Sequence, residues 1–281
     1  MNTVTNDSLN GAVLDANVVY HTALAETYDE TQPHFRPENE ARVRTSLQTL
    51  AEQTPARRLL DLGCGTGFVM NLAAPYFDNV VGADITQAML DRVPDLPNLE
   101  TRLVDTSDLP FEDLAFDVCT AYSFLHHLSD LEPTLREAAR VLKPGGILWA
   151  SADPNRLFWE HMKSLEGRQG MVDFVQREVD AVDGMCEEIA DATGLTTKQV
   201  TMAEFQKMEL GGFDPDEISD LLRSLGFGVV RCDFEWFLGQ GKVLHEQSAA
   251  AATEIESYLQ SALPATRHLF KYVSFTARKE R

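Results

Sequence analysis

Residues 59–67 read LLDLGCGTG, an apolar run that contains one acid and continues into glycines at every second position. Glycine loses more backbone entropy on folding than other residues, so three glycines this close together indicate a turn that another group approaches closely. The turn lacks the G-x-G-x-x-G spacing of dinucleotide-binding loops, because residue 68 is Phe, and it lacks the G-K-[ST] of phosphate loops. Asp61 would repel a pyrophosphate and attract an ammonium group. The stretch therefore predicts a strand, a tight turn and a helix around a ligand that carries a cation.

Strand-like and helix-like segments alternate after this turn. The predicted strands are NVVGADI, LETRLVD, DVCTAYSF and GGILWASAD, and helical patterns such as TQAMLDRV and DLEPTLREAARVL lie between them. Alternation at this spacing indicates right-handed crossovers between parallel strands. The sequence therefore predicts an α/β fold with a doubly wound, mostly parallel sheet that is covered on both faces.

The rest of the chain divides around this core. Residues 1–17 are polar without clear periodicity and are expected to be loose, whereas 18–29 and 37–54 are expected to be helical. Residues 156–212 are helix-like and interrupt the alternation, which resumes with a helix after Asp214, a strand at 228–237, a helix near 244–262 and a strand at 268–279. We predict an N-terminal helical segment (1–55), a core (56–155), a helical insertion (156–212) and a segment that completes the sheet (213–281).

Composition excludes several classes of function. The chain has 24 Lys and Arg against 44 Asp and Glu, a net charge of −20, which disfavours nucleic acid and anionic membranes as partners. It has no apolar run of about 18 residues and no secretory signal pattern at its start, so cytoplasmic residence is the default expectation. Four scattered cysteines and no histidines clustered at ligand spacing argue against disulfides or a metal site.

The pattern D-x-G-x-G-x-G followed by an acid at the next strand end resembles the class I S-adenosylmethionine (SAM)-dependent methyltransferases. VVGADIT, LVDTSDLPF, FDVCTAYSFLHHL and EAARVLKPGGILWAS resemble the family's next four segments, in order, so the resemblance covers about residues 59–150. Small-molecule enzymes similar to the ubiquinone and menaquinone methyltransferases are the nearest type. The resemblance implies a Rossmann-like sheet of seven strands with an antiparallel last strand, SAM as the cofactor, and the N-terminal segment and the insertion as covers for the cofactor and the substrate.

The resemblance also implies the residues that hold SAM. Asp84 would bind the ribose hydroxyls, Asp105 the adenine amino group, and Asp61 the ammonium end. Tyr28, in AETYDETQPHFRP, would lie near the methionine moiety, or would only pack its helix on the sheet. The full cofactor set is Tyr28, Asp61, Gly63, Cys64, Gly65, Asp84, Ile85, Met89, Asp105, Thr106 and Ala121.

The acceptor is expected beside the ends of the fourth and fifth core strands, near Tyr122 and Asp153. His126 or His127 is the candidate catalytic base, although adjacent histidines at this place also suit a structural role. Tyr122 is a candidate hydrogen-bonding group. Aromatic residues of the insertion either roof the acceptor pocket or form a small core or dimer face of their own; they are Phe158, Trp159, Phe174 and Phe205.

These expectations leave three functions open. Methyl transfer to a small-molecule metabolite or natural-product intermediate is favoured. A SAM-using enzyme that catalyses cyclisation or a pericyclic reaction, and a non-catalytic SAM-binding partner subunit, would share the same cofactor residues. Neither the acceptor atom nor the choice between monomer and homodimer follows from the sequence.

Overall fold

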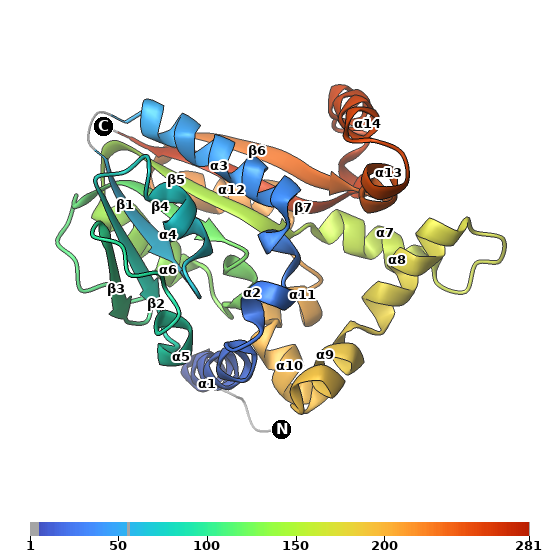
Figure 1. The fold of residues 1–281 in the computed structure, drawn as a ribbon, viewed down its shortest axis with the longest axis horizontal. Helices are drawn as coiled ribbons and strands as arrows, with labels where there is room; N and C mark the ends of the chain where they lie inside the picture. Colours follow the sequence, from blue (N-terminus) through green and yellow to red (C-terminus); the bar gives the residue numbers. More distant parts are fainter. Residues whose placement is uncertain (1–5, 55–56, 281) are drawn as a thin grey trace.

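A single mixed sheet organises the chain in the computed structural model, which describes residues 6–54 and 57–280 (Figure 1). The strand order is β3-β2-β1-β4-β5-β7-β6, in which β1 to β5 are parallel and β7 runs antiparallel to both β5 and β6. The predicted Rossmann-like, seven-stranded sheet is therefore confirmed. The strands are β1 (Arg58–Leu62), β2 (Asn79–Asp84), β3 (Leu99–Leu103), β4 (Phe116–Tyr122), β5 (Leu142–Pro154), β6 (Phe227–Phe237) and β7 (Phe270–Lys279).

Helices cover both faces of the sheet because side chains alternate along each strand. In β1, Leu59 packs on the face covered by α3 (Pro37–Glu52) and α4 (Phe68–Ala73). Leu60 and Leu62 lie on the opposite face, in the apolar cluster that also includes residues of α6 (Glu132–Val141) and α12 (Pro215–Ser224). Both sides of these strands are thus buried, as expected for parallel strands.

The insertion forms an arc of helices beyond the carboxyl end of β5 (Figure 1). It comprises α7 (Arg156–Leu165), α8 (Asp173–Asp183), α9 (Met185–Thr193), α10 (Thr197–Ala203) and α11 (Phe205–Met208). Phe158, Trp159, Met162 and Val179 form a small apolar core within it. The remaining elements are α5 (Gln87–Leu90), α13 (Gln240–Glu246), α14 (Ala249–Ser261) and the short 3-10 helices η1 (Pro33–Phe35), η2 (Leu125–His127) and η3 (Arg267–Leu269).

The expectation that residues 1–17 are loose is wrong for residues 6–17, and residues 1–5 lie outside the described part. Helix α1 (Asn6–Leu24) begins at residue 6, and α2 (Tyr28–Thr31) follows it. The buried face of α1 carries Val13, Ala16 and Tyr20, and Ala16 and Tyr20 pack against α9 and α10 of the insertion. Figure 1 shows α1 beside α9 and α10, which are far from it in the sequence. Apolar residues lie on the exposed side of α1 as well, such as Val18 and Val19, so its sequence shows little periodicity.

Two smaller differences concern segments near the boundaries. The single helix expected near 244–262 is two helices, α13 and α14, which Ser248 separates by capping the second: its hydroxyl accepts a hydrogen bond from the Ala251 amide. The boundary expected at residues 55 and 56 lies outside the described part. Within residues 6–54 and 57–280, no helix combines the length and the apolar character that crossing a bilayer demands.

Candidate functional site

The glycine loop is held against the neighbouring strand by its own backbone. The amides of Gly63 and Cys64 both donate to the carbonyl of Ala83 in β2, at 2.8 and 3.1 Å. Gly63 and Gly65 have φ of +64° and +53°, a left-handed conformation that side chains disfavour. The backbone conformation of this turn therefore favours glycine even without a ligand.

Asp84 orders the same loop from the end of β2. One carboxylate oxygen accepts the Gly65 amide at 2.9 Å, and the other accepts the Thr86 amide at 2.8 Å. Each oxygen keeps a further lone pair, so the fixed carboxylate can accept two more hydrogen bonds. A ligand with two neighbouring hydroxyl groups, such as a ribose, matches this arrangement.

A cavity opens over the loop, and the sequence-predicted cofactor residues line it, except for one. Ala121 is fully buried within β4 and does not reach the cavity. The others are Tyr28, Asp61, Gly63, Cys64, Gly65, Asp84, Ile85, Met89, Asp105 and Thr106. Their roles toward a cofactor stay predictions, but the fold brings them to one place.

Asp61 supplies a buried acid at one end of this cavity. Its side chain is 2% exposed, and the Thr120 hydroxyl donates to it at 2.7 Å. Burial raises the pKa of Asp61 to about 7; the hydrogen bond from Thr120 opposes the rise and the negative charge of Asp84 adds to it. A cationic ligand group would favour the ionised form, so the cavity fits a ligand with an ammonium group.

The aromatic ring of Phe124 makes the closest approach to the glycine loop. A Cβ atom placed on Gly63 would lie 2.0 Å from this ring, inside van der Waals contact. The sequence predicted that another group approaches this turn closely. In the structure a side chain from the loop after β4 packs there and forms part of the cavity wall.

The N-terminal helices are tied to the cavity by polar contacts that the sequence did not reveal. The Thr66 hydroxyl donates to Asp29 in α2 at 2.6 Å, and the Asn17 amide of α1 donates to the carbonyl of His127 at 3.0 Å. Asn10, Val13, Leu14 and Asn17 of α1 also line the cavity. These residues were missed because residues 6–17 gave no helical signal.

A second cavity of about 360 Å³ lies against the first, under the insertion. Its wall includes Glu204 and Lys207 from the insertion, and Trp236 and Tyr272 from β6 and β7. The two cavities share the side chains of His21, Tyr28, His34, Tyr122, Ser123 and His127. The two cavities therefore adjoin at this common wall.

Backbone strain gathers in the second cavity. Four non-glycine residues of the described chain have positive φ, and three of them line this cavity: Ser123 (+51°), Ala152 (+63°) and Trp236 (+58°). They follow or lie in β4, β5 and β6, near the strand ends that face the insertion. Strained positions of this kind gather at functional sites. Phe237, the residue after Trp236, also lines this cavity and packs in the sheet core at the same time.

The candidate histidines are buried and held by hydrogen bonds. His126 Nδ1 lies 2.9 Å from Asp153, and His127 Nδ1 lies 2.7 Å from the carbonyl of Ala203. Burial lowers the pKa of His126 to about 4 and that of His127 well below its ordinary value. Both rings are therefore neutral near pH 7. Tyr122 accepts a hydrogen bond from Asn39 at 2.8 Å, and burial raises its pKa to about 12, so it stays protonated.

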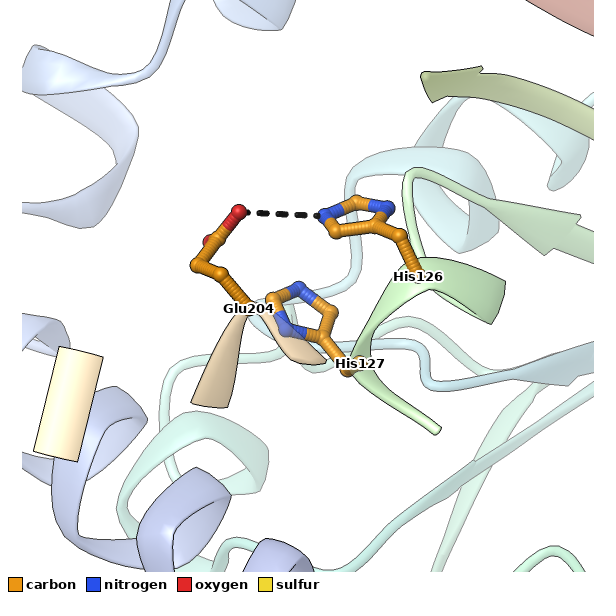
Figure 2. A group of neighbouring side chains, drawn as sticks. All are labelled: His126, His127 and Glu204. Atoms are coloured by element: carbon orange, nitrogen blue, oxygen red, sulfur yellow. Dashed lines mark ion pairs between the residues drawn. The ribbon is translucent and has the colours of Figure 1, made fainter. Parts of the chain in front are cut away.

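Glu204 joins the two histidines in a compact cluster (Figure 2). One atom from each of the three side chains lies within 4.8 Å of the others, and all three residues are buried. The sequence shows no histidines at ligand spacing, but the fold brings these three side chains together. Glu204 is 77 positions from His127, and no local sequence pattern connects them.

The aromatic residues of the insertion divide between the two interpretations. Phe158 lines the second cavity, which fits a roof over the acceptor. Trp159 packs in the small core of the insertion instead, and Phe174 lines a separate hollow beside β6 and α13. Phe205 is partly exposed and lines none of the three hollows described.

Residues 60–150 match the family model of a methyltransferase domain. The chain thus carries a class I SAM-dependent methyltransferase domain, whose cofactor is SAM. The first cavity fits that cofactor: Asp84 suits its ribose and Asp61 its ammonium group.

The names of known proteins similar to this chain refer to different methyl acceptors. The 27-O-demethylrifamycin SV methyltransferase of Amycolatopsis mediterranei is 38% identical over 110 residues, which cover 35% of this chain and 40% of that protein. The probable tRNA methyltransferase 9B of Bos taurus is 31% identical over 140 residues, covering 47% of this chain and 30% of that protein. The chain spans about half the length, or less, of the curated relatives it matches.

Among solved structures, the phosphoethanolamine N-methyltransferase 2 of Haemonchus contortus in complex with SAM has a TM-score of 0.58 at 14% identity. The similarity covers 99% of this chain and 61% of that one. At this level of identity the comparison shows a shared fold.

Proposed function

We propose that the protein transfers a methyl group from SAM to a small molecule bound in the second cavity. The observation that carries the proposal is the common wall of the two cavities, which would bring the methyl end of the cofactor to the acceptor. The two reactants would then meet without an intervening layer of bulk solvent. Holding two reactants in line at short distance removes much of the barrier of a bimolecular step.

SAM supplies a methyl group on a positively charged sulfur, together with a neutral thioether leaving group. The protein residues therefore need to position the reactants and exclude water. Asp84 and Asp61 would hold the two ends of the cofactor from β2 and β1, which fixes the methyl group between them. Tyr28, in both cavity walls, offers an aromatic ring where a cation is expected.

The second cavity offers two histidines as candidate bases. His126 and His127 are neutral near pH 7 because burial lowers their pKa, so either ring can accept a proton from a hydroxyl or a thiol. Of the two, only His127 lines both cavities. The buried hydroxyl of Tyr122, in the common wall, can donate a hydrogen bond to either ligand.

A small acceptor is favoured over nucleic acid by charge and by shape. The net charge of −20 opposes a phosphate backbone, and the acceptor cavity lies under a helical insertion. Relatives of this domain include a protein named for tRNA and another named for a rifamycin, so the experiment must include both kinds of acceptor.

The test has two stages. Calorimetry with SAM and with its demethylated product measures binding to the first cavity. Incubation with methyl-labelled SAM follows, with a panel of small phenols, hydroxy acids, thiols and amines in one arm and bulk tRNA in another. Label in a small product supports the proposal. Label in tRNA refutes the small-molecule assignment, and an altered but unlabelled product identifies a non-methylating reaction.

A further inference from the structure

We infer that His126, His127 and Glu204 form a binding site for a divalent transition metal, with an open position toward the acceptor cavity. All three side chains line that cavity, and His127 also lines the cofactor cavity. The metal would therefore stand where the acceptor meets the methyl donor. Its role toward an acceptor rests on the proposed function, whereas metal binding itself does not.

The distances fit a metal centre after a small contraction. Bonds of about 2.0–2.2 Å from a metal to nitrogen and oxygen place ligand atoms about 3.4 Å apart in a tetrahedron. His126 Nε2 and Glu204 Oε2 are 3.7 Å apart, and all three ligand atoms lie within 4.8 Å of one another. Figure 2 shows Glu204 and the two rings converging on one point. Rotation of the flexible Glu204 side chain can close the remaining distance.

Both rings are oriented as metal-ligating histidines usually are. A ligating histidine donates its other ring N–H to a carboxylate or a backbone carbonyl, which fixes the tautomer and frees the ligating nitrogen. His127 Nδ1 faces the Ala203 carbonyl, which only accepts, so its Nε2 carries the lone pair. His126 Nδ1 lies 2.9 Å from Asp153 Oδ1, which also accepts the backbone amide of His126 at 3.2 Å, so this oxygen acts as an acceptor and Nδ1 carries the proton. Both Nε2 atoms are therefore left for a metal.

The two ligand segments are joined rigidly. Glu204 lies between α10 and α11, and the next helix begins one residue later. Gln206 in that helix donates to the carbonyls of Leu128 and Ser129, at 2.9 and 3.2 Å, directly after the histidines. The ligands thus come from two segments whose relative position is set by other contacts, which favours a preformed site.

Two groups already contact Glu204. Lys207 Nζ lies 3.0 Å from its Oε2, and the Tyr20 hydroxyl also interacts with it. The oxygen that faces His126 Nε2 is the same Oε2, so a metal would either share this oxygen with Lys207 or bind Oε1 after the carboxylate rotates.

Two imidazoles and one carboxylate suit zinc or iron(II), and three protein ligands leave a position for another molecule. A hydroxyl or thiol acceptor that takes this position loses its proton more readily, as metal-bound water does. With a metal bound neither histidine has a free ring nitrogen, so the metal takes the place of the histidine base and the proton leaves to solvent. The oxygen or sulfur then forms the bond to the methyl carbon while the carbon–sulfur bond of SAM breaks and its electron pair stays on the thioether. The acceptor class is thus a hydroxyl or thiol compound able to ligate a metal.

The experiment uses the full chain without a histidine tag, stripped with a chelator. Zn²⁺ is titrated by calorimetry, and Co²⁺ by its visible absorption bands. We expect one equivalent of each to bind to the unmodified protein. Glu204→Gln should abolish the cobalt bands, and Asp153→Asn should weaken binding about 10- to 100-fold through the orientation of His126.

A second histidine pair provides the matched control. The rings of His161 and His268 are 4.8 Å apart and line neither cavity. The double variant His161→Asn/His268→Asn should keep full binding. Absence of cobalt bands in the unmodified protein, unchanged binding in Glu204→Gln, or loss of binding in the control pair would each overturn the metal site.

Binding of SAM to every sample reports whether the variant is folded. If Glu204→Gln does not fold, a Zn²⁺-dependent rise in the melting temperature of the unmodified protein, absent in His127→Gln, supports the site, and equal rises overturn it. Failure of SAM to bind the unmodified protein refutes the proposed function and leaves the metal result standing. Loss of metal binding with intact SAM binding refutes the metal site alone.

Discussion

Replacing Gly63 by alanine tests the close packing at the centre of the cofactor site. The change brings two separate costs. The backbone φ of +64° is disfavoured for a residue with a Cβ atom, and the new Cβ would lie 2.0 Å from the ring of Phe124. A left-handed conformation costs about 1–2 kcal/mol and overpacking about 1–3 kcal/mol, so Gly63→Ala should lower the free energy of unfolding by about 2–5 kcal/mol.

Gly145→Ala isolates the backbone part of this cost. Gly145 has φ of +80°, and a Cβ there would meet nothing within 4 Å. Its replacement should therefore cost only the conformational part, about 1–2 kcal/mol. The assay is urea unfolding followed by circular dichroism, with both variants measured beside the unmodified protein.

A double-mutant cycle then isolates the steric part. In a Phe124→Ala background the clash is gone, so Gly63→Ala should cost no more than Gly145→Ala does. An equal cost of Gly63→Ala in both backgrounds would show that the Phe124 ring does not constrain Gly63, and the reasoning would fail.

Three further predictions concern the site and its support. Asp84→Ala removes a carboxylate that orders two amides and is placed to hold two ribose hydroxyls, and should weaken SAM binding at least about 100-fold by calorimetry. Burial raises the pKa of Asp61 to about 7, and the cofactor's ammonium group favours the ionised form, so SAM should bind about tenfold more tightly at pH 8 than at pH 6. A pH dependence that survives in Asp61→Asn would refute that assignment. The same raised pKa means that Asp61 favours folding of the free protein at low pH and loses this contribution as pH rises through about 7. Asn155→Ala removes the side-chain amide that donates to the carbonyls of Arg267 and Phe270, and it also removes the N-cap of α7. It should lower the free energy of unfolding, measured in urea, by about 2–5 kcal/mol. A change within error of zero would count against these hydrogen bonds.

The sequence predicted the parts of the site whose function depends on local spacing. A strand, a glycine turn and an acid at the next strand end follow one another closely, so Asp61, Gly63 and Asp84 could be placed together from the order of elements alone. Parallel strands carry their carboxyl ends to one edge, and that rule needs no knowledge of side-chain packing.

The missed features depend on packing between distant segments. Glu204 meets His126 and His127 only because the insertion folds back across the sheet edge and Gln206 fixes it there. The N-terminal helix was missed for a related reason: the side that carries Ala16 and Tyr20 can be recognised only when α9 and α10 pack against it. Neither contact can be predicted from a short stretch of sequence, because each joins segments that are far apart in the chain.

The position of β7 between β5 and β6 has a consequence for synthesis on the ribosome. The first cavity is lined by residues up to Thr134, whereas the second needs Trp236 from β6 and Tyr272 from β7. β6 is made before β7 but joins the sheet only through it, as Figure 1 shows. A growing chain therefore contains every residue that lines the first cavity before the strands that close the second cavity are made, so a ligand of the first cavity can be captured before the second cavity is assembled.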